Sequence, residues 1–529
     1  MANPRTRPYA LRPSGVSDTL DSDTGRKGAM AALTNLIPDP STPGVYQCRP
    51  AAESQTTFSS FTTPGFISVY KVVGSYAYGL IASGRNTGLD EPFCWDIVNK
   101  AFKTVSGITT AKCPTSPATT GAWNPPTMDL MGAKLVVTHP GFDGSTYFYG
   151  VFDISTPDAP TWDAGNTATN GLPSLPRAVV GYSNRLYFAC ANNLYYTDTL
   201  ALTMTLSTQF LTFGDNTAIT ALAPLPLFTD QQGGIVQSFM AFKEVGIAQI
   251  TGDISLSTLT MSVLSSTEGT LAPRSVSATP MGVAFVAADG VRLITQQGAV
   301  SPPDNDIAAS LISPITPSRI SGCYNNGVYR LCFQNSTVSG QPYQDFWLDT
   351  TKKGWSGPHS FRHDMLSPYE GSFLLFNGAV SHTLFMSDVV QSGSSSFTEN
   401  GTALSFTYET PPMPNGDGMY ENSAVISTID MVPGGTGTTY NFEATDTIDG
   451  ILNQCSLTVG ASLPQWGTAT WGSFNWSAAA SNLRAYNIPW TIPLVFNRLS
   501  VTISGSSVSS FRIGTLKIGY TSLAYVRTS

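Results

Sequence analysis

The sequence predicts an all-β protein: an irregular β-propeller with an extended N-terminal arm and a C-terminal β-sandwich-like domain. Two observations lead to this expectation. Short runs rich in β-branched and aromatic residues alternate with Asn-Gly or Asp-Gly turns over most of the chain. A motif in which Asp follows an aromatic residue also recurs at irregular intervals. Irregular repeats of several short strands are typical of propeller blades, while a stack of unrelated β-sandwiches remains the alternative.

Residues 1–60 are expected to form the extended arm. Prolines interrupt this stretch at positions 4, 8, 13, 38, 40, 43 and 50. Because proline breaks regular elements, one short helix could form only over Arg26 to Leu36.

Residues 61–391 are expected to form the propeller-like region with insertions. The aromatic–Asp motif is followed by a loop and a second aromatic residue in three places: Trp95-Asp96 before Phe102, Phe152-Asp153 before Trp162, and Trp347 with Asp349 before Trp355. We expect the Asp to cap the turn backbone and the aromatics to fill the space between sheets. About six or seven blades fit this region, against the usual four to eight.

Hairpins are predicted where Asn or Asp precedes Gly, because both central residues of such a turn need positive φ. These sites are Asp289-Gly290, Asn326-Gly327 and Asn377-Gly378, with weaker turns at Asn184-Arg185 and Asn192-Asn193. The clearest case lies between the apolar run Gly282 to Ala287 and the alternating run Val291 to Thr295.

Residues 392–529 are expected to form the sandwich-like domain. Strands are predicted at Ala403 to Thr410, Asn422 to Val432, Thr438 to Ala444, Cys455 to Val459, Asn497 to Ser504 and Phe511 to Tyr520. Trp466, Trp471 and Trp476 recur every five residues, which fits neither one helix face nor one strand face. We consider them candidate subunit-interface aromatics, with packing inside a loop-rich region as the alternative.

The composition favours an assembly protein over a lone soluble enzyme. Charged residues make up only 12% of the 529 residues, while 41% are hydrophobic. Net charge is −8, and Arg5, Arg7 and Arg12 form the only basic cluster. This argues against gripping nucleic acid by phosphate neutralisation, although it allows a pore through which DNA slides.

The chain is expected to be made in a reducing cytosol. None of the seven cysteines forms a CxxC, so they are interpreted as mostly buried small apolar residues. The N-terminus lacks the apolar segment of a signal peptide, and no run approaches the roughly 18 apolar residues of a membrane span. Export by the standard signal route is therefore not expected.

No enzyme activity, cofactor or metal is expected. The sequence lacks GxSxG, HExxH and a glycine-rich phosphate loop. His359 and His363 could bind a metal on a helix, but Ser356-Gly357-Pro358 precedes them, so surface or packing roles are favoured. Ser155 to Trp162 is a single near match to the Asp-box of propeller glycosidases, with the Asp one place late and Pro160 replacing Gly.

Three stretches, in order, carry a resemblance to a known family. Leu33, Asn35, Ile37-Pro38, Gly44 and Arg49-Pro50 match an N-terminal "L.N.IP……G….RP" pattern. Thr251-Gly252-Asp253, Glu268-Gly269, Ala272-Pro273 and the Asp289-Gly290 hairpin follow in the centre, and a "WG…WG" tract lies near the end. Together they resemble tail nozzle (tail tubular protein B-like) proteins of short-tailed bacteriophages, the podoviruses.

This resemblance implies a structural virion protein that forms a homohexameric ring at the distal tail. The ring would lie below the adaptor ring protein, with tail fibres or spikes nearby, and would close and open the channel through which genomic DNA leaves. The alternative function is a receptor- or carbohydrate-binding protein of the tail spike or adhesin type. Channel-lining residues cannot be assigned from the sequence.

Overall fold

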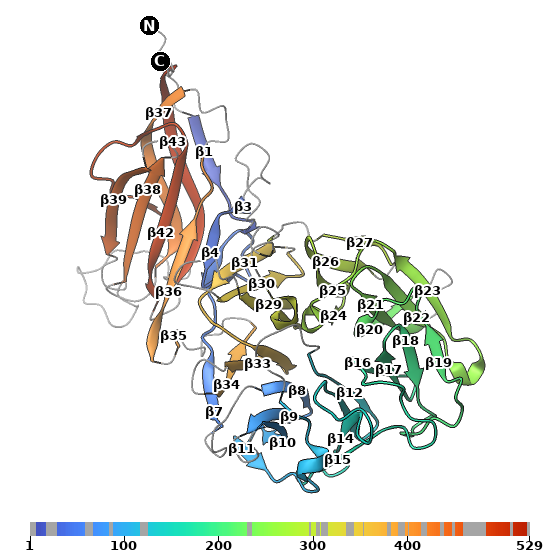
Figure 1. Ribbon diagram of the computed structural model, residues 1–529. Helices are drawn as coiled ribbons and strands as arrows, with labels where there is room; N and C mark the ends of the chain where they lie inside the picture. The colour runs from blue at the N-terminus through green and yellow to red at the C-terminus, as the bar shows by residue number, and fades with distance from the viewer. Residues whose placement is uncertain are drawn as a thin grey trace.

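In the computed structural model, seven four-stranded blades form a propeller, and a β-sandwich packs against one side of it (Figure 1). The predicted fold class is confirmed. The structure describes residues 7–16, 29–58, 67–83, 88–116, 125–229, 235–295, 298–302, 307, 311, 316–334, 343–352, 354–377, 382–389, 397–399, 401–413, 420–433, 438–446, 450–458, 483–507 and 511–525.

Within these residues, six blades are separate antiparallel sheets, and the remaining blade is part of a larger sheet. The first blade contains β8 (Ile67–Val73), β9 (Tyr76–Ser83), β10 (Leu89–Asp96) and β11 (Ala101–Lys103), the second β12 (Thr127–Met131), β13 (Lys134–Thr138), β14 (Tyr149–Asp153) and β15 (Thr161–Gly165), and the third β16 (Ala178–Tyr182), β17 (Arg185–Cys190), β18 (Asn193–Tyr196) and β19 (Phe210–Thr212). The fourth blade contains β20 (Ile219–Thr229), β21 (Ile235–Lys243), β22 (Ile247–Thr251) and β23 (Thr260–Ser265), and the fifth β24 (Ser277–Thr279), β25 (Gly282–Ala287), β26 (Gly290–Thr295) and β27 (Val300–Ser301). The sixth blade contains β28 (Ser321–Asn325), β29 (Val328–Gln334), β30 (Tyr343–Asp349) and β31 (Gly354–His359), and the seventh β32 (Met365–Tyr369), β33 (Ser372–Asn377), β34 (Thr383–Asp388) and β7 (Glu53–Thr57).

The ring closes at the last blade, whose outer strand comes from the N-terminal arm. β7 pairs with β34, so residues more than 300 positions apart in sequence complete one sheet. The inner strands β8, β12, β16, β20, β24, β28 and β32 contact one another in turn. Short 3-10 helices lie at Thr110–Lys112, Ile254–Leu256, Pro273–Ser275 and Pro317–Arg319.

Every boundary between neighbouring blades carries a polar contact near the inner strands. Seen in ring order, these contacts are Lys71 with Asp129, Asp129 with the Gly181 amide, the Tyr182 hydroxyl with the Gly252 carbonyl, Thr220 with the Thr270 carbonyl, Ser277 with the Tyr324 amide, Asn325 with the Ser372 carbonyl, and Ser367 with the Val72 amide. Between them lie apolar cores contributed by adjacent blades. Each blade is therefore fixed by its two neighbours.

One side chain links two blades that are not neighbours. Arg274, in the 3-10 helix before β24, donates a hydrogen bond to the carbonyl of Ser68 in β8. These residues belong to the fifth and first blades, which are not neighbours, so the bond reaches across the interior of the ring. Burial lowers the pKa of the Arg274 guanidinium to about 10, which still leaves it charged at neutral pH.

The predicted aromatic–Asp motif lies at the turn between the third and fourth strands of a blade. Asp96, Asp153 and Asp349 each accept a backbone N–H two or three residues later, at 2.9–3.0 Å. The same position holds Asp198, which binds Thr203 and Thr205, and Asp253, which accepts from the Ser255 amide. The predicted capping role is confirmed, and it extends to two further blades.

The paired aromatics of the motif pack across the same two strands in two blades. Ring centroids are 4.8 Å apart for Trp95 with Phe102, and 4.8 Å for Phe152 with Trp162. In the third case, Trp355 packs on Phe346 at 6.4 Å, because Leu348 and not Trp347 lies opposite it in the register.

The predicted hairpins form, and most of their turns begin one residue early. Asn326-Gly327 is the two-residue loop as expected, with φ of 43° and 89°. The other loops are Ala288-Asp289, Ser183-Asn184 and Ala191-Asn192. β33 ends at Asn377, and Gly378 lies outside the described residues.

The C-terminal region forms two packed sheets, as predicted. One contains β36 (Thr402–Glu409), β42 (Leu499–Ser507), β38 (Thr439–Asp446) and β39 (Gly450–Thr458), with β35 (Thr398–Glu399) beside β36. The other contains β37 (Tyr420–Val432) and β43 (Arg512–Tyr525), flanked by β40 (Arg484–Asn487), β41 (Val495–Phe496), β1 (Arg7–Leu11), β6 (Tyr46–Cys48) and β5 (Leu36–Pro38). The arm thus supplies three strands to this sheet.

The helix expected over Arg26 to Leu36 is wrong. The described part of that stretch holds β3 (Ala29–Met30), β4 (Ala32–Thr34) and the start of β5, with β2 (Gly15–Val16) parallel to β3. β4 lies between two strand edges, pairing with β31 on one side and β36 on the other. Partners on both sides override the local preference of Ala and Leu for helix.

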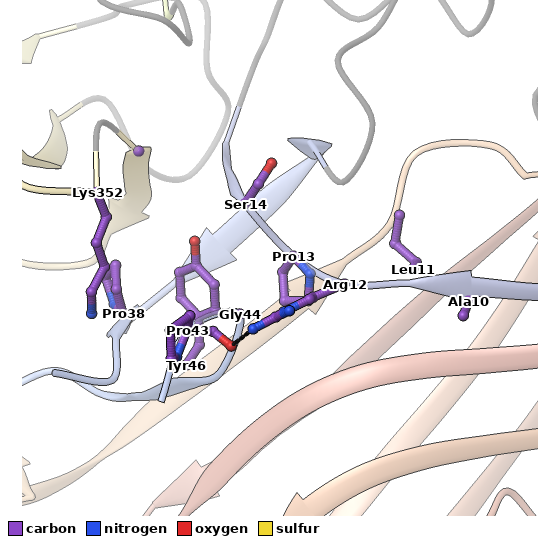
Figure 2. A pocket seen from close by; sticks show the side chains of 11 residues that line it. Ala10, Leu11, Arg12, Pro13, Ser14, Pro38, Pro43, Gly44, Tyr46 and Lys352 are labelled. Carbon is purple, nitrogen blue, oxygen red and sulfur yellow. Dashed lines mark hydrogen bonds between the residues drawn. The ribbon is translucent and has the colours of Figure 1, made fainter. Parts of the chain in front are cut away.

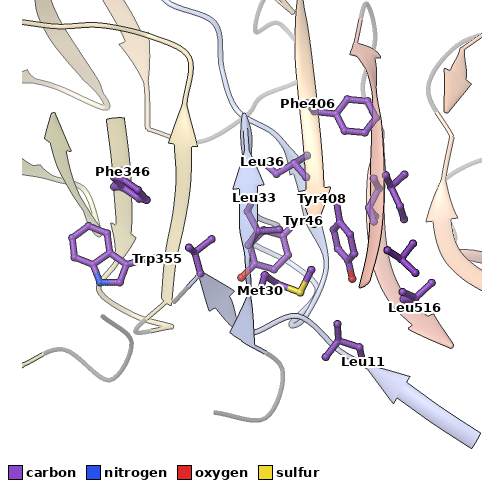
Figure 3. Packing of buried hydrophobic residues seen from close by; sticks show 14 of the residues in the cluster. Leu11, Met30, Leu33, Leu36, Tyr46, Phe346, Trp355, Phe406, Tyr408 and Leu516 are labelled. Carbon is purple, nitrogen blue, oxygen red and sulfur yellow. The ribbon is translucent and has the colours of Figure 1, made fainter. Parts of the chain in front are cut away.

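One hydrophobic core runs from the propeller into the sandwich (Figure 3). Trp355 and Phe346 enter it from the sixth blade, Leu33 from the arm, and Tyr408 and Leu516 from the sandwich. Five of the seven cysteines are buried and two are half-buried, and none of them forms a disulfide, as expected. In the residues described, no helix has the length and apolarity to span a membrane.

The close fit of Trp162 against Gly150 can be tested by a single methyl group. In Gly150→Ala the added Cβ would overlap the indole of Trp162, so we expect a loss of roughly 1–3 kcal/mol from overpacking. Gly165→Ala, at the end of β15 with open space around it, should change stability by less than about 0.5 kcal/mol. Urea unfolding measures both, and equal effects would show that the Trp162 packing is not tight.

Candidate functional site: the joint between propeller and sandwich

The candidate site is the joint at which the arm binds the two domains together. Leu33, the central residue of β4, pairs with Gly357 of β31 and with Tyr408 of β36. One twelve-stranded sheet therefore extends from the propeller into the sandwich through a strand of three residues. The joint is formed by the N-terminal stretch around Leu33 and Asn35.

Asn35 connects three parts of the chain directly after β4. Its amide donates to Nδ1 of His359 at 2.9 Å, and its side-chain Nδ2 donates to the Ser405 carbonyl at 2.6 Å and to Oγ of Ser360 at 2.9 Å. Its backbone has φ of 55°, a left-handed conformation that Asn tolerates better than most residues. Asparagine therefore suits this position in two ways: its side chain forms the hydrogen bonds, and its backbone tolerates the left-handed conformation.

Arg49 holds the arm to the start of the sandwich. It is fully buried and forms two parallel bonds to Glu399, from Nη1 at 3.0 Å and from Nη2 at 3.1 Å. Its Nε donates to Oδ1 of Asn35 at 2.8 Å. Burial alone would lower the pKa of Arg49, but the Glu399 carboxylate outweighs it and raises that pKa. Bidentate geometry of this kind is the strong form of a buried ion pair.

A second buried cluster lies in the sixth blade. Asp345 accepts hydrogen bonds from Arg330 Nη2 at 2.7 Å, Trp347 Nε1 at 3.1 Å and His363 Nε2 at 3.2 Å. The Arg330 guanidinium packs over the Trp347 ring, 4.6 Å from its centroid. Burial would raise the pKa of Asp345, but the charge of Arg330 and the His363 bond hold it far below its usual value. Asp345 therefore stays ionised within the core.

His359 and His363 are held in the neutral form. Both are buried, which lowers their pKa values, and for His359 the nearby Arg49 and Arg330 lower it further against the opposing effect of Asp345. Nδ1 of His359 accepts the Asn35 amide, so a proton there would remove a buried hydrogen bond. The packing role predicted for the two histidines is confirmed, whereas a surface position is wrong.

Two cavities flank the joint. The first, called the arm pocket, has a volume of about 430 Å³ and lies among residues 10–14 of the arm, the Pro38–Tyr46 segment and the β30–β31 turn (Figure 2). The second, of about 320 Å³, lies on the other side of Pro38 and Lys352 and is lined by Asn326, Asp349 and Val389 among others. Volumes of this size suit a small ligand or a short peptide segment.

The remaining candidate residues do not gather at this joint. Asp158 of the Asp-box near match is exposed and bonds the Tyr76 hydroxyl, while Trp162 is buried between blades. Trp466, Trp471 and Trp476 lie outside the described residues. Within the described chain, no group of three or more His, Cys, Asp or Glu side chains is placed to hold a metal ion.

Sequence reasoning missed the buried ionic residues. Arg49 and Asn35 belong to the N-terminal pattern, which does not indicate that they are buried, and the sequence motifs do not include Arg330, Asp345 or Glu399. A usable signal was present in β29 and β30, where Arg330 and Asp345 interrupt apolar strands. Charged residues inside such runs are rarely buried unless they form an ion pair, so the sequence could have suggested an ion pair between Arg330 and Asp345.

Comparison with known proteins yields fold likenesses only. No protein-family model and no curated protein matches the chain. Among solved structures, an exo-β-1,3-galactanase from Phanerochaete chrysosporium is 9% identical, with 89% of this chain and 100% of that chain covered and a TM-score of 0.23. An auxiliary nutrient binding protein from Bacteroides thetaiotaomicron is 10% identical, with 72% and 76% covered and a TM-score of 0.33. At these TM-scores, neither likeness carries an argument about function.

Removing the Asp345 charge should strongly destabilise the joint. Asp345→Asn leaves the buried Arg330 guanidinium without a counter-charge, and breaking such a pair costs about 3–5 kcal/mol. Asp158→Asn, which alters an exposed carboxylate, should change stability by less than about 1 kcal/mol. Denaturant unfolding followed by Trp fluorescence measures both, and comparable losses would contradict the stated role of Asp345.

Stability should fall as the pH drops below about 6.5. His359 and His363 have folded pKa values below that of the unfolded chain, so in this range the unfolded state binds more protons. Each can contribute up to about 1.4 kcal/mol per pH unit, and the depressed pKa of Asp345 adds a further loss below about pH 4.

The histidine contribution can be isolated by substitution. His359→Asn places an amide oxygen near the position of Nδ1 and cannot titrate, so its stability should depend less steeply on pH between 7 and 5. Urea midpoints of the parent chain and the variant provide the comparison. Parallel pH curves would show that His359 does not contribute.

Proposed function

We propose that this chain is a structural subunit of the distal tail nozzle of a short-tailed bacteriophage. It would be made in the host cytoplasm, assemble as a homohexameric ring below the adaptor ring protein, and close the DNA-exit channel until the host is engaged. The work of such a protein is mechanical, and no catalytic step is included in the proposal.

The observation that carries the proposal is the role of the resembling residues in the joint. Leu33 joins the two sheets, Asn35 bridges three segments, and Arg49 pairs with Glu399. The residues on which the resemblance to nozzle proteins is based are thus also residues that connect the propeller to the sandwich, and this supports the proposal. A ring that retains DNA needs subunits that do not hinge under load.

The proposal also includes a path for DNA, which would lie outside the propeller. Arg274 reaches from the fifth blade to Ser68 in the first, so a side chain occupies part of the propeller interior, and we do not route DNA through it. In the proposed ring, DNA would pass through an opening enclosed by the six copies. The low share of charged residues, 12%, suits a wall along which DNA slides without being gripped.

Negative-stain microscopy with native mass spectrometry tests the proposal. The purified chain should form six-fold rings with a central opening and a mass of six copies. A stable trimer would contradict the nozzle and favour the receptor- or carbohydrate-binding alternative. Glycan-array binding by a species that forms no ring would have the same consequence.

A further inference from the structure

The arm pocket presents two cations and no carboxylate among its lining residues. Arg12 comes from the arm and Lys352 from the turn between β30 and β31. Leu11, Pro13 and Tyr46 contribute apolar side chains to the lining. Asp349 approaches the Lys352 amine only at 4.0 Å, and its Oδ1 caps the turn by accepting the Lys352 amide.

Both cations are held in place by main-chain carbonyls. Arg12 donates from Nη2 to the Pro43 carbonyl at 2.5 Å (Figure 2). Lys352 donates from Nζ to the Asp39 carbonyl. The Arg12 side chain lies directly against Gly44, where an added Cβ would overlap it, and Gly44 has φ of 73°. A neutral carbonyl orients each group without cancelling its charge, and the guanidinium keeps further N–H donors free for another acceptor.

A carboxylate is the group that fits this arrangement. The arginine fork binds carboxylates with two parallel bonds, and a lysine nearby adds a second positive charge. The apolar lining can bury a side chain next to that carboxylate, and a cavity of about 430 Å³ accommodates a short peptide segment.

We propose that the arm pocket docks a carboxylate-bearing segment of a second copy of this chain. The proposal rests on the ring put forward above. With 35 acidic residues against 27 basic ones, a second copy offers carboxylates in excess. Glu53, Glu244 and Glu370 are exposed and form no ion pair within the described residues. A pocket on one copy and a carboxylate elsewhere on the next make a head-to-tail contact, the type that closes a ring.

Zero-length cross-linking tests this contact. Unlabelled and ¹⁵N-labelled chains are mixed in equal amounts and treated with a carbodiimide, which joins a carboxylate to a lysine amine by an amide bond. Lys352 should appear in peptides that combine one labelled and one unlabelled partner. Arg12→Gln, at an exposed position, should reduce these mixed peptides about tenfold by removing charge-assisted bonds.

Glycine substitutions provide the matched control. Gly44→Ala should reduce the mixed peptides because the new methyl group displaces Arg12. Gly74→Ala introduces the same group at a glycine with φ of 59° and open space around it, so it carries comparable backbone strain without affecting the pocket. Mixed peptides at Lys352 should persist in this control.

The outcomes separate this inference from the proposed function. If Lys352 cross-links only within its own chain, or not at all, the pocket does not dock a second copy, even where rings are seen in the same sample. If mixed peptides form and respond to Arg12→Gln while microscopy shows no six-fold ring, the pocket is supported and the nozzle is not. Mixed peptides that are unchanged in both Arg12→Gln and Gly44→Ala would also overturn the inference.

Discussion

The structure depends on one constraint: β4 must form backbone hydrogen bonds with two strands at once, β31 of the propeller and β36 of the sandwich. The last strand of the sixth propeller blade is β31, and the first long strand of the sandwich sheet is β36. Unpaired edges expose rows of amide and carbonyl groups and invite aggregation. A three-residue strand from the arm covers both edges, and Leu33 buries its side chain in the core that the two domains share. The boundary between propeller and sandwich therefore lies inside a continuous sheet, at β4.

Buried polar groups make this joint specific. A joint made only of apolar contacts could slide, since apolar packing has little directional preference. Asn35, Arg49 and His359 instead require partners at fixed positions on three separate segments. Such clusters stabilise weakly in net terms, because desolvation opposes the attraction, but removing one partner is costly. Here they set the register in which arm, blade and sandwich meet.

Much of the fold could be predicted because its signals are local. The Asp caps at Asp96, Asp153 and Asp349 and the Asn326-Gly327 turn depend on a few adjacent residues, so sequence alone located them. The joint depends on pairs such as Arg49 with Glu399, which are 350 positions apart, and no local pattern reveals that distance. The same reason explains the wrong helix at Arg26 to Leu36. Its residues allow a helix in isolation, and only the two distant strand edges decide otherwise.

The order of the chain gives the joint a further consequence. The arm is made first, yet β4 cannot pair with β36 until residues beyond 400 exist, and β1 waits for β43 near the end of the chain. β7 likewise completes the last blade only after β34 is available. Contacts this distant in sequence form late, because closing a long loop costs entropy before any contact offsets it. Arg12, Pro43 and Lys352 come together only when these strands are in place, so the arm pocket exists only on a completed subunit. In the proposed ring, a subunit could therefore dock its neighbour only after its own arm has paired with these strands.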